Sequence, residues 1–229
     1  MKLSVIIPAF NEEGTILKVL QRLNETKVDN IEYEFIVIND GSTDSTKKIL
    51  DDNQNLFSTM INNEKNSGKG YSVKEGLKIA KGDYIIFQDA DLEYDPLDFK
   101  KFIKICKDFD ADVVLGSRFN YSEYTRSHNA LNKIGNHILT FIFNILYNTT
   151  FTDIYSCYAC FKKELLNVES LKTEGFEQHA EILGKIIKRG KKFYEVPINY
   201  NGRTHEEGKK IKFHHIFPVI FQIIKGRIN

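Results

Sequence analysis

The sequence predicts an α/β fold, a mostly parallel sheet flanked by helices. Short apolar segments rich in β-branched residues alternate with helical patterns through the first half of the chain. This alternation is typical of right-handed βαβ units. The composition, 41% hydrophobic and 28% charged over 229 residues, is that of a globular protein able to bury a core without disulfides or a structural metal.

Each predicted strand of the first half is a short apolar run that fits a buried position in a sheet. These runs occupy residues 3–7, 33–38, 84–88 and 113–116. Between the strands, apolar residues recur at helical spacing, most clearly at Ile16, Leu17, Leu20 and Leu23. The helices are predicted at residues 13–23, 43–52, 69–81 and 96–109.

The second half has a different pattern. Its polar segments, 119–132 and 199–212, predict loops, the first of them mobile. The remaining elements are predicted to be an apolar helix, a more polar helix, a short strand and a last helix, at residues 134–147, 174–189, 193–198 and 213–225. Because no repeat or low-complexity linker interrupts the chain, we expect one domain over residues 1–229.

Charge is distributed unevenly along the chain. Residues 1–110 carry 15 Lys and Arg against 20 Asp and Glu, whereas residues 111–229 carry 17 against 11. Residues 209–229 contain five basic residues and no acid, interleaved with phenylalanines and bulky aliphatics. That mixture favours a basic amphipathic helix on a surface over a nucleic-acid groove, so we expect no nucleic-acid partner.

The expected location of the protein depends on two kinds of segment that we do not find in the sequence, a signal peptide and a membrane span. The N-terminal apolar run ends at Pro8 without a cleavage site, and no stretch approaches the roughly 18 apolar residues of a membrane span. Cys106, Cys157 and Cys160 are interpreted as buried thiols in a reducing compartment. We expect a cytoplasmic protein, and peripheral attachment to the cytoplasmic face of a membrane stays open.

Acidic residues follow three of the predicted strands, at the edge of the sheet where α/β proteins bind ligands. They lie in residues 11–13, 40–44 and 89–93. Carboxylates gathered in this way repel one another unless a cation joins them. The alternation Asp89, Asp91, Glu93 places three carboxylates on one side of an extended segment, where they could hold a divalent ion that bridges the phosphates of a nucleotide.

Each of these signals also has a simpler interpretation. Asp40-Gly41-Ser42 can be an Asx turn, and Asp89-Ala90-Asp91 a solvated loop. Residues 66–70 can cap a helix instead of cradling a phosphate, and they lack the pattern of a P-loop.

Taken together, the motifs resemble those of family-2 glycosyltransferases with the GT-A fold, most closely the dolichol-phosphate mannosyltransferase branch. The resemblance covers nearly the whole chain in order. It rests on residues 8–13, 39–44, 68–70, 89–94 with Pro96, 116–119, Thr152-Asp153, Gly175-Phe176, 195–198, Arg203 and 207–211. It implies a nucleotide-sugar-binding half at 1–118 and an acceptor-side half at 119–229 that ends in an amphipathic helix.

The resemblance also implies the donor site. Residues that would bind the nucleotide sugar are Pro8, Phe10, Glu12, Asp40, Lys69, Asp89, Ala90, Asp91, Arg203 and Lys209. Asp91 and Glu93 would hold Mg²⁺ or Mn²⁺, while Arg203 and Lys209 would clasp the donor diphosphate as their loop closes. Phe10 stands in place of the usual Tyr and Glu93 in place of a common Gln, and both changes leave this site intact.

On the acceptor side, the resemblance implies that Arg118 contacts the acceptor phosphate. Further acceptor contacts would come from Arg126, His128 and Asn132. A phosphate acceptor is already an anion and needs no enzymic base. A hydroxyl acceptor does need one, for which Asp153 and Glu181 are the candidates. The catalytic set is thus expected to be Asp91, Arg118, Asp153 and Glu181.

The activity that the resemblance implies is that of a metal-dependent inverting hexosyltransferase. Its donor would be a nucleotide sugar of the GDP-mannose or UDP-glucose type, and its favoured acceptor a polyprenyl or dolichyl phosphate at a membrane surface. One alternative is transfer to a hydroxyl of a glycan or small molecule. Another, from a different class, is a non-catalytic nucleotide-binding or receiver-like α/β module. The sequence does not predict the oligomeric state.

Overall fold

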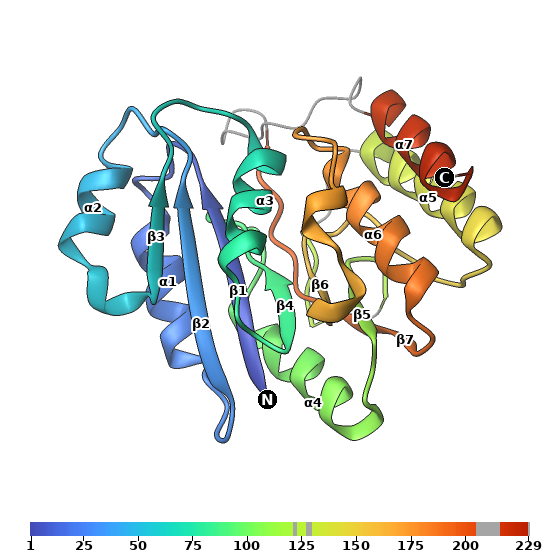
Figure 1. Ribbon diagram of the computed structural model, residues 1–229, viewed down its shortest axis with the longest axis horizontal. Helices are drawn as coiled ribbons and strands as arrows, with labels where there is room; N and C mark the ends of the chain where they lie inside the picture. Colours follow the sequence, from blue (N-terminus) through green and yellow to red (C-terminus); the bar gives the residue numbers. More distant parts are fainter. Residues whose placement is uncertain (121–122, 127–129, 205–215, 229) are drawn as a thin grey trace.

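The computed structural model describes residues 1–120, 123–126, 130–204 and 216–228. Seven strands within these residues form one sheet in the order β3-β2-β1-β4-β6-β5-β7 (Figure 1). Their bounds are β1 Lys2–Ala9, β2 Glu32–Asn39, β3 Thr59–Asn62, β4 Tyr84–Phe87, β5 Val113–Ser117, β6 Ala159–Lys162 and β7 Phe193–Pro197. Strands from both halves of the chain therefore belong to the same sheet.

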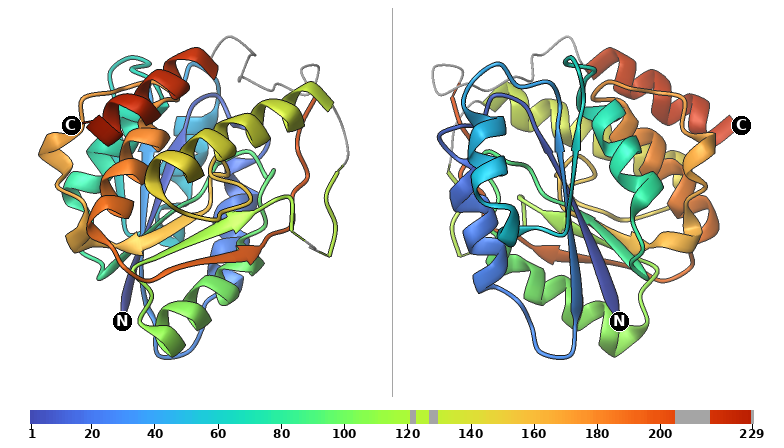
Figure 2. Two further views of the ribbon diagram at one scale, coloured as in Figure 1. Left: turned by 90° about the vertical axis from the view of Figure 1, so that its right-hand side faces the viewer. Right: turned by 60° about the vertical axis from the view of Figure 1, so that its left-hand side comes forward.

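The helices of the described residues fall into three groups around the sheet. Their bounds are α1 Ile16–Glu25, α2 Thr46–Asp52, α3 Lys69–Ile79, α4 Phe99–Phe109, α5 Ala130–Tyr147, α6 Gln178–Arg189 and α7 Ile216–Ile228. Figure 2 shows α1 and α4 on one face of the sheet and α3 and α6 on the other. Helices α5 and α7 lie side by side beyond α6, near the carboxyl ends of the first strands.

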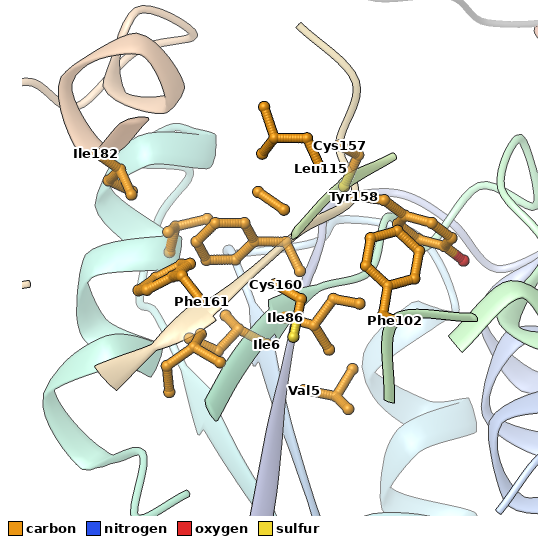
Figure 3. Close-up of a cluster of buried hydrophobic side chains, with 14 of the residues drawn as sticks. Val5, Ile6, Ile86, Phe102, Leu115, Cys157, Tyr158, Cys160, Phe161 and Ile182 are labelled. Atoms are coloured by element: carbon orange, nitrogen blue, oxygen red, sulfur yellow. The ribbon is translucent and has the colours of Figure 1, made fainter. Parts of the chain in front are cut away.

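Burial on both faces explains the apolar strand sequences. Residues 3–7 of β1 are buried, as are residues 34–39 of β2 and all of β4. A sheet covered by helices on both sides selects continuous apolar runs instead of alternation. Figure 3 shows part of this core, in which Ile6 and Ile86 of adjacent strands lie near Phe161 and the ring of Tyr158 lies beside Phe102.

The predicted α/β class and the mostly parallel sheet are confirmed, but two strands were not predicted. β3 is a four-residue strand whose residues are at least partly exposed, so it carries no buried-strand pattern. β6 pairs antiparallel with both β4 and β5 and separates them. Its four residues follow a loop and carry no alternation that could distinguish a strand from a buried helical turn.

Helix boundaries also differ from the predicted ones. The apolar helix α5 begins at Ala130, inside the predicted loop 119–132, and α6 begins at Gln178 instead of residue 174. The predicted helix at 96–109 is a short 3-10 turn, Pro96–Asp98, followed by α4. Start positions differ because apolar spacing indicates which side of a helix is buried and does not define its first residue.

The start of α3 is fixed against a distant segment of the chain. The backbone N–H of Tyr71 donates to the carbonyl of Glu174 at 3.2 Å. A Cβ atom added to Gly70 would lie 2.4 Å from the carbonyl carbon and oxygen of Glu174, a distance that real Cβ atoms do not reach. Glycine at this position therefore allows two backbones to approach where the loop of residues 174–176 meets α3.

We expect Gly70→Ala to destabilise the protein by about 1–3 kcal/mol, because one of the two backbones must shift to admit the methyl group. Thermal unfolding measures the change, at about 2–4 °C for each kcal/mol in a chain of this size. The matched control is Gly14→Ala, whose added Cβ would meet nothing within 4 Å. Equal melting temperatures for the two variants would contradict this account.

Candidate active site

A pocket of about 480 Å³ lies at the carboxyl edge of the sheet. Residues that follow β1, β2, β4 and β5 line it, together with the start of α3 and parts of α5, α6 and α7. All of the predicted donor-site residues that the structure describes line this pocket. They are Pro8, Phe10, Glu12, Asp40, Lys69, Asp89, Ala90, Asp91 and Arg203. Lys209, predicted to join them, lies outside the described residues.

Arg203 occupies the centre of the acidic cluster. Its guanidinium contacts Asp91 at 2.8 Å and Glu12 at 3.3 and 3.4 Å. Its backbone N–H donates to the Oε1 atom of Glu93 at 2.8 Å. The Nε atom is buried and lies 3.6 Å from the same Glu93 oxygen, without a hydrogen-bond partner among the described residues. One cationic side chain thus joins carboxylates that follow β1 and β4.

A second cation neutralises the remaining carboxylate of the predicted motif. The Lys69 ammonium, at the start of α3, pairs with Asp89. Burial by itself would raise the pKa of Asp89, but the adjacent Lys69 ammonium lowers it. Asp91 behaves in the opposite way. Burial and the neighbouring Asp89 and Glu93 carboxylates raise the pKa of Asp91 to about 7.

Asp40 and Glu93 line the pocket and also hold neighbouring parts of the chain in place through hydrogen bonds. The Asp40 carboxylate accepts backbone N–H groups from Ser67 at 3.1 Å and Gly68 at 2.9 Å, which fixes the turn before α3. Both Glu93 oxygens are engaged, one by the backbone of Arg203 and the other by the hydroxyl of Tyr200 at 2.7 Å. Asp91 is engaged as well, because its Oδ1 atom accepts the backbone N–H of Glu93 at 3.1 Å and its Oδ2 atom pairs with Arg203.

The described residues include no group of three or more His, Cys, Asp or Glu side chains placed to hold a metal ion. This donor set still fits Mg²⁺ or Mn²⁺ that arrives with a diphosphate, because Mg²⁺ is usually bound through one or two carboxylates plus substrate phosphates. The oxygen donors of Asp91 and Glu93 suit such hard cations, and the position between them already attracts the positive charge of Arg203.

On the opposite side of the pocket, Arg118 is held by a fully buried carboxylate. Its Nε and Nη2 groups donate to Asp153 at 2.7 and 2.9 Å, in a bidentate ion pair. Asp153 also accepts the backbone N–H of Arg118 at 3.1 Å. Arg118 lines the pocket, whereas Asp153 lies behind it. The geometry makes Asp153 a positioning residue for Arg118 and does not favour the predicted alternative that it acts as a base.

The other predicted acceptor-side residues do not all line the pocket. Glu181 is buried away from the pocket lining, where it accepts backbone N–H groups of Lys172 and Thr173, so it is not placed to act as a base. Asn132 lines the pocket. Arg126 is exposed outside the lining and donates to the carbonyl of Gly202 at 3.2 Å. His128 lies outside the described residues.

Several pocket residues were not predicted. Tyr200 donates its hydroxyl to Glu93, and its ring lies 5.2 Å from the Arg118 guanidinium. Tyr155 and His179 also line the pocket, and a His179 Nε2–H can donate to the carbonyl of Ile154 at 3.1 Å. Burial, and then Lys69, lower the pKa of His179 to about 4, so its imidazole is neutral at pH 7. Tyr155 and Tyr200 lie outside the helices and strands, and His179 is a single polar residue in the first turn of α6, so no spacing signal could have identified them.

Comparisons with known proteins agree with this geometry. The family described as Glycosyl transferase family 2 matches residues 4–168. An uncharacterized protein of Methanocaldococcus jannaschii is 33% identical over 96% of both chains. From Haloferax volcanii, the low-salt glycan biosynthesis hexosyltransferase Agl6 is 28% identical over 89% of this chain, and glycosyltransferase AglJ is 29% identical over 87%. The chain spans 49% of Agl6 and 63% of AglJ.

Solved structures show the same GT-A fold at low sequence identity. Glucosyl-3-phosphoglycerate synthase from Mycobacterium tuberculosis, in complex with Mn²⁺, UDP and phosphoglyceric acid, is 20% identical with a TM-score of 0.73. The match covers 99% of this chain and 78% of that one. TarS of S. aureus in complex with UDP-GlcNAc is 20% identical with a TM-score of 0.66, over all of this chain and 67% of that one.

The raised pKa of Asp91 predicts an unusual dependence of stability on pH. A carboxyl group whose pKa is higher in the folded state than in the unfolded chain makes the folded state bind more protons. The free energy of unfolding therefore falls as pH rises from about 4 to about 7, the interval between the unfolded and folded pKa values of Asp91. Above that interval the full destabilisation is present.

We expect Asp91→Asn, without added metal, to melt above the wild type at pH 8 and to lose this advantage toward pH 5. Thermal unfolding across this pH range checks the prediction. Glu75→Gln is a matched control, because its carboxylate pairs with Lys78 on α3 outside the pocket. A variant that melts below the wild type at every pH would show that the ion pair with Arg203 outweighs the repulsion in the cluster.

Proposed function

The chain belongs to glycosyl transferase family 2, and we propose that it transfers a hexose, with inversion, from a nucleoside diphosphate sugar to the phosphate of a polyprenyl lipid. The observation that carries the choice of acceptor is the state of the acceptor-side carboxylates. Asp153 is paired with Arg118, and Glu181 is capped by backbone N–H groups. Glu195 accepts from the backbone of Thr152 and Asp153. Because these three carboxylates are engaged within the fold, they are poorly placed to remove a proton from a hydroxyl, and an acceptor that is already an anion needs no such base.

The donor half of the proposal rests on the cluster of charges at the sheet edge. Departure of a nucleoside diphosphate places negative charge on the bridging oxygen, which nearby cations stabilise. Arg203 and Lys69 stand beside Asp91 and Asp89 and supply such positive charge. The UDP complexes of two structural neighbours support a nucleotide ligand of this class.

The acceptor half rests on Arg118 and on the apolar end of the pocket. The bidentate pair with Asp153 fixes the Arg118 guanidinium at the pocket wall, and arginine is well suited to phosphate recognition. The same lining includes apolar residues of three helices, Leu139 of α5, Ile182 of α6 and Val219 of α7. A phosphate attached to a hydrocarbon chain matches a pocket that combines a fixed arginine with apolar residues.

In the proposed reaction, an oxygen of the acceptor phosphate attacks the anomeric carbon from the face opposite the diphosphate. The new carbon–oxygen bond forms as the bond to the diphosphate breaks, and the electron pair leaves with the nucleoside diphosphate. The acceptor oxygen is already anionic, so no proton needs to be removed. Arg118 orients the acceptor, and Arg203 neutralises the leaving group. Mg²⁺ or Mn²⁺, held by Asp91 with Glu93 beside it, supplies further positive charge to the diphosphate when bound.

Transfer to a hydroxyl of a glycan or small molecule is the second candidate. It would need a base, and the pocket residue His179 is a weak one, because burial and Lys69 lower the pKa of its imidazole to about 4. Two relatives whose names refer to hexosyl or glycosyl transfer, and the phosphoglycerate complex of a structural neighbour, are compatible with this alternative.

The deciding experiment compares two acceptors that differ by one group. The purified protein is incubated with Mn²⁺ and radiolabelled GDP-mannose or UDP-glucose, together with a short-chain polyprenyl phosphate or the matching polyprenol, both in detergent. We expect label in the lipid product only with the phosphate, and with one of the two donors. Label transferred to polyprenol but not to the phosphate would overturn the proposed acceptor.

We expect Asp91→Ala to reduce transfer by at least about 100-fold while the fold stays intact, because an interaction with the transition-state charge is lost. Circular dichroism and thermal unfolding check the fold, and Mn²⁺-dependent nucleotide binding is measured by calorimetry. Asp44→Ala is the control, since Asp44 caps the turn before α2 and does not line the pocket. Undiminished turnover by Asp91→Ala would refute the role given to this carboxylate.

A further inference from the structure

The paired helices α5 and α7 bury one side and expose the other. Helix α5 packs inward through Leu139 and Phe143, and α7 through Val219 and Ile223. The Tyr147 hydroxyl at the end of α5 donates to the carbonyl of Ile223 at 3.2 Å, which ties the two helices together. Their inner sides thus account for the stable packing of the pair.

The outer side of α5 is unusually apolar. Leu131, Ile134, Ile138, Phe141 and Ile145 are 46–67% exposed, although each is a large hydrophobic residue. Their spacing of three and four residues places them on one stripe of the helix. A helix that needed only to cover the pocket would carry polar residues on this side.

The outer side of α7 repeats this pattern. Phe217, Phe221, Ile224 and Ile228 are 41–79% exposed and again follow one stripe. Of the thirteen large hydrophobic residues that are exposed within the described part of the chain, nine lie on these two helices. We call the two stripes together the α5–α7 face. Such a concentration marks an interaction surface, not the ordinary scatter of surface hydrophobics.

Charge identifies the partner. Neither helix contains Asp or Glu, and the charged residues within them are Lys133, Lys225 and Arg227. A second copy of the same basic face would bring like charges together. An anionic lipid surface instead offers hydrocarbon to the Phe and Ile side chains and negative headgroups to the cations. No helix of the described residues is long and apolar enough to cross a membrane.

The α5–α7 face is continuous with the pocket. Leu131 on its edge lines the pocket, and so do Gly135 of α5 and Ile216 of α7. From these three residues the lining leads to Arg118 and Asp91. We propose that the α5–α7 face docks on an anionic bilayer, so that the pocket opens beside the headgroups. This orientation brings the pocket to its acceptor if the acceptor is a lipid phosphate, as proposed above. The docking itself does not depend on the identity of the acceptor.

The absence of tryptophan from the chain allows a direct test. Single substitutions Phe141→Trp and Phe221→Trp place one fluorophore on each helix of the face. Phe109→Trp places a control fluorophore at an exposed phenylalanine, 49% accessible, at the end of α4. With vesicles of phosphatidylcholine and phosphatidylglycerol, we expect a blue shift and quenching by brominated lipid chains at 141 and 221 but not at 109.

A flotation assay tests whether vesicle binding is lost when the α5–α7 face is made acidic. We expect the double variant Phe141→Glu/Ile145→Glu to bind anionic vesicles at least about tenfold more weakly than the wild type. Leu97→Glu, at an exposed leucine outside the face, should bind as the wild type does. Equal melting temperatures show that all variants are folded. Unchanged vesicle binding by the double variant, or no binding by the wild type, would overturn the proposal.

Two further measurements separate the possible failures. A concentration-dependent dimer in sedimentation analysis, dissociated by Phe141→Glu/Ile145→Glu, would assign the face to a second copy of the chain and overturn the bilayer. Vesicle binding is measured without donor or acceptor, whereas transfer is measured with detergent-dispersed short-chain acceptor. Docking without transfer to the phosphate would refute the proposed acceptor alone, and transfer without docking would refute the membrane face alone.

Discussion

The structure depends on neutralising the carboxylates that parallel strands bring to one edge of the sheet. Glu12 follows β1, and Asp89, Asp91 and Glu93 follow β4, so the topology places four acidic side chains around one pocket. Arg203 and Lys69 reach this pocket from distant parts of the chain and pair with them. Only Asp91 has a strongly raised pKa within this cluster, which makes it the group where a further positive charge is most favourable.

The acceptor side of the pocket follows a different rule. There the carboxylates bind backbone N–H groups or a single arginine within the fold, and they hold loops in place. The acidic residues on both sides are neutralised within the fold, but by different groups. Arg203 and Lys69 pair with the carboxylates around Asp91, whereas Arg118 and backbone N–H groups engage those behind Arg118. A sequence motif does not show such partners, which is why the sequence alone left Asp153 and Glu181 as candidate bases.

Much of this organisation could be predicted from the sequence, and the exceptions have physical causes. The buried parallel strands and the carboxylate motif of residues 89–93 were predictable because both depend on short-range patterns. β6 was not, since its place between β4 and β5 depends on long-range antiparallel pairing. Tyr200 reaches the pocket from a loop, where no periodicity operates, and His179 does so from the first turn of α6, where apolar spacing does not single out a polar residue. The outward apolar stripe of α5 could not be told from a buried one, because apolar residues occupy both its inner and its outer side.

The insertion of β6 has a geometric consequence for what the pocket can hold. With β6 between them, β4 and β5 stand two strand spacings apart, about 10 Å. Asp91 follows the first of these strands and Arg118 follows the second. Direct pairing of β4 with β5 would halve that separation. The antiparallel strand thus acts as a spacer, and its width sets the distance between the two strand ends after which Asp91 and Arg118 lie.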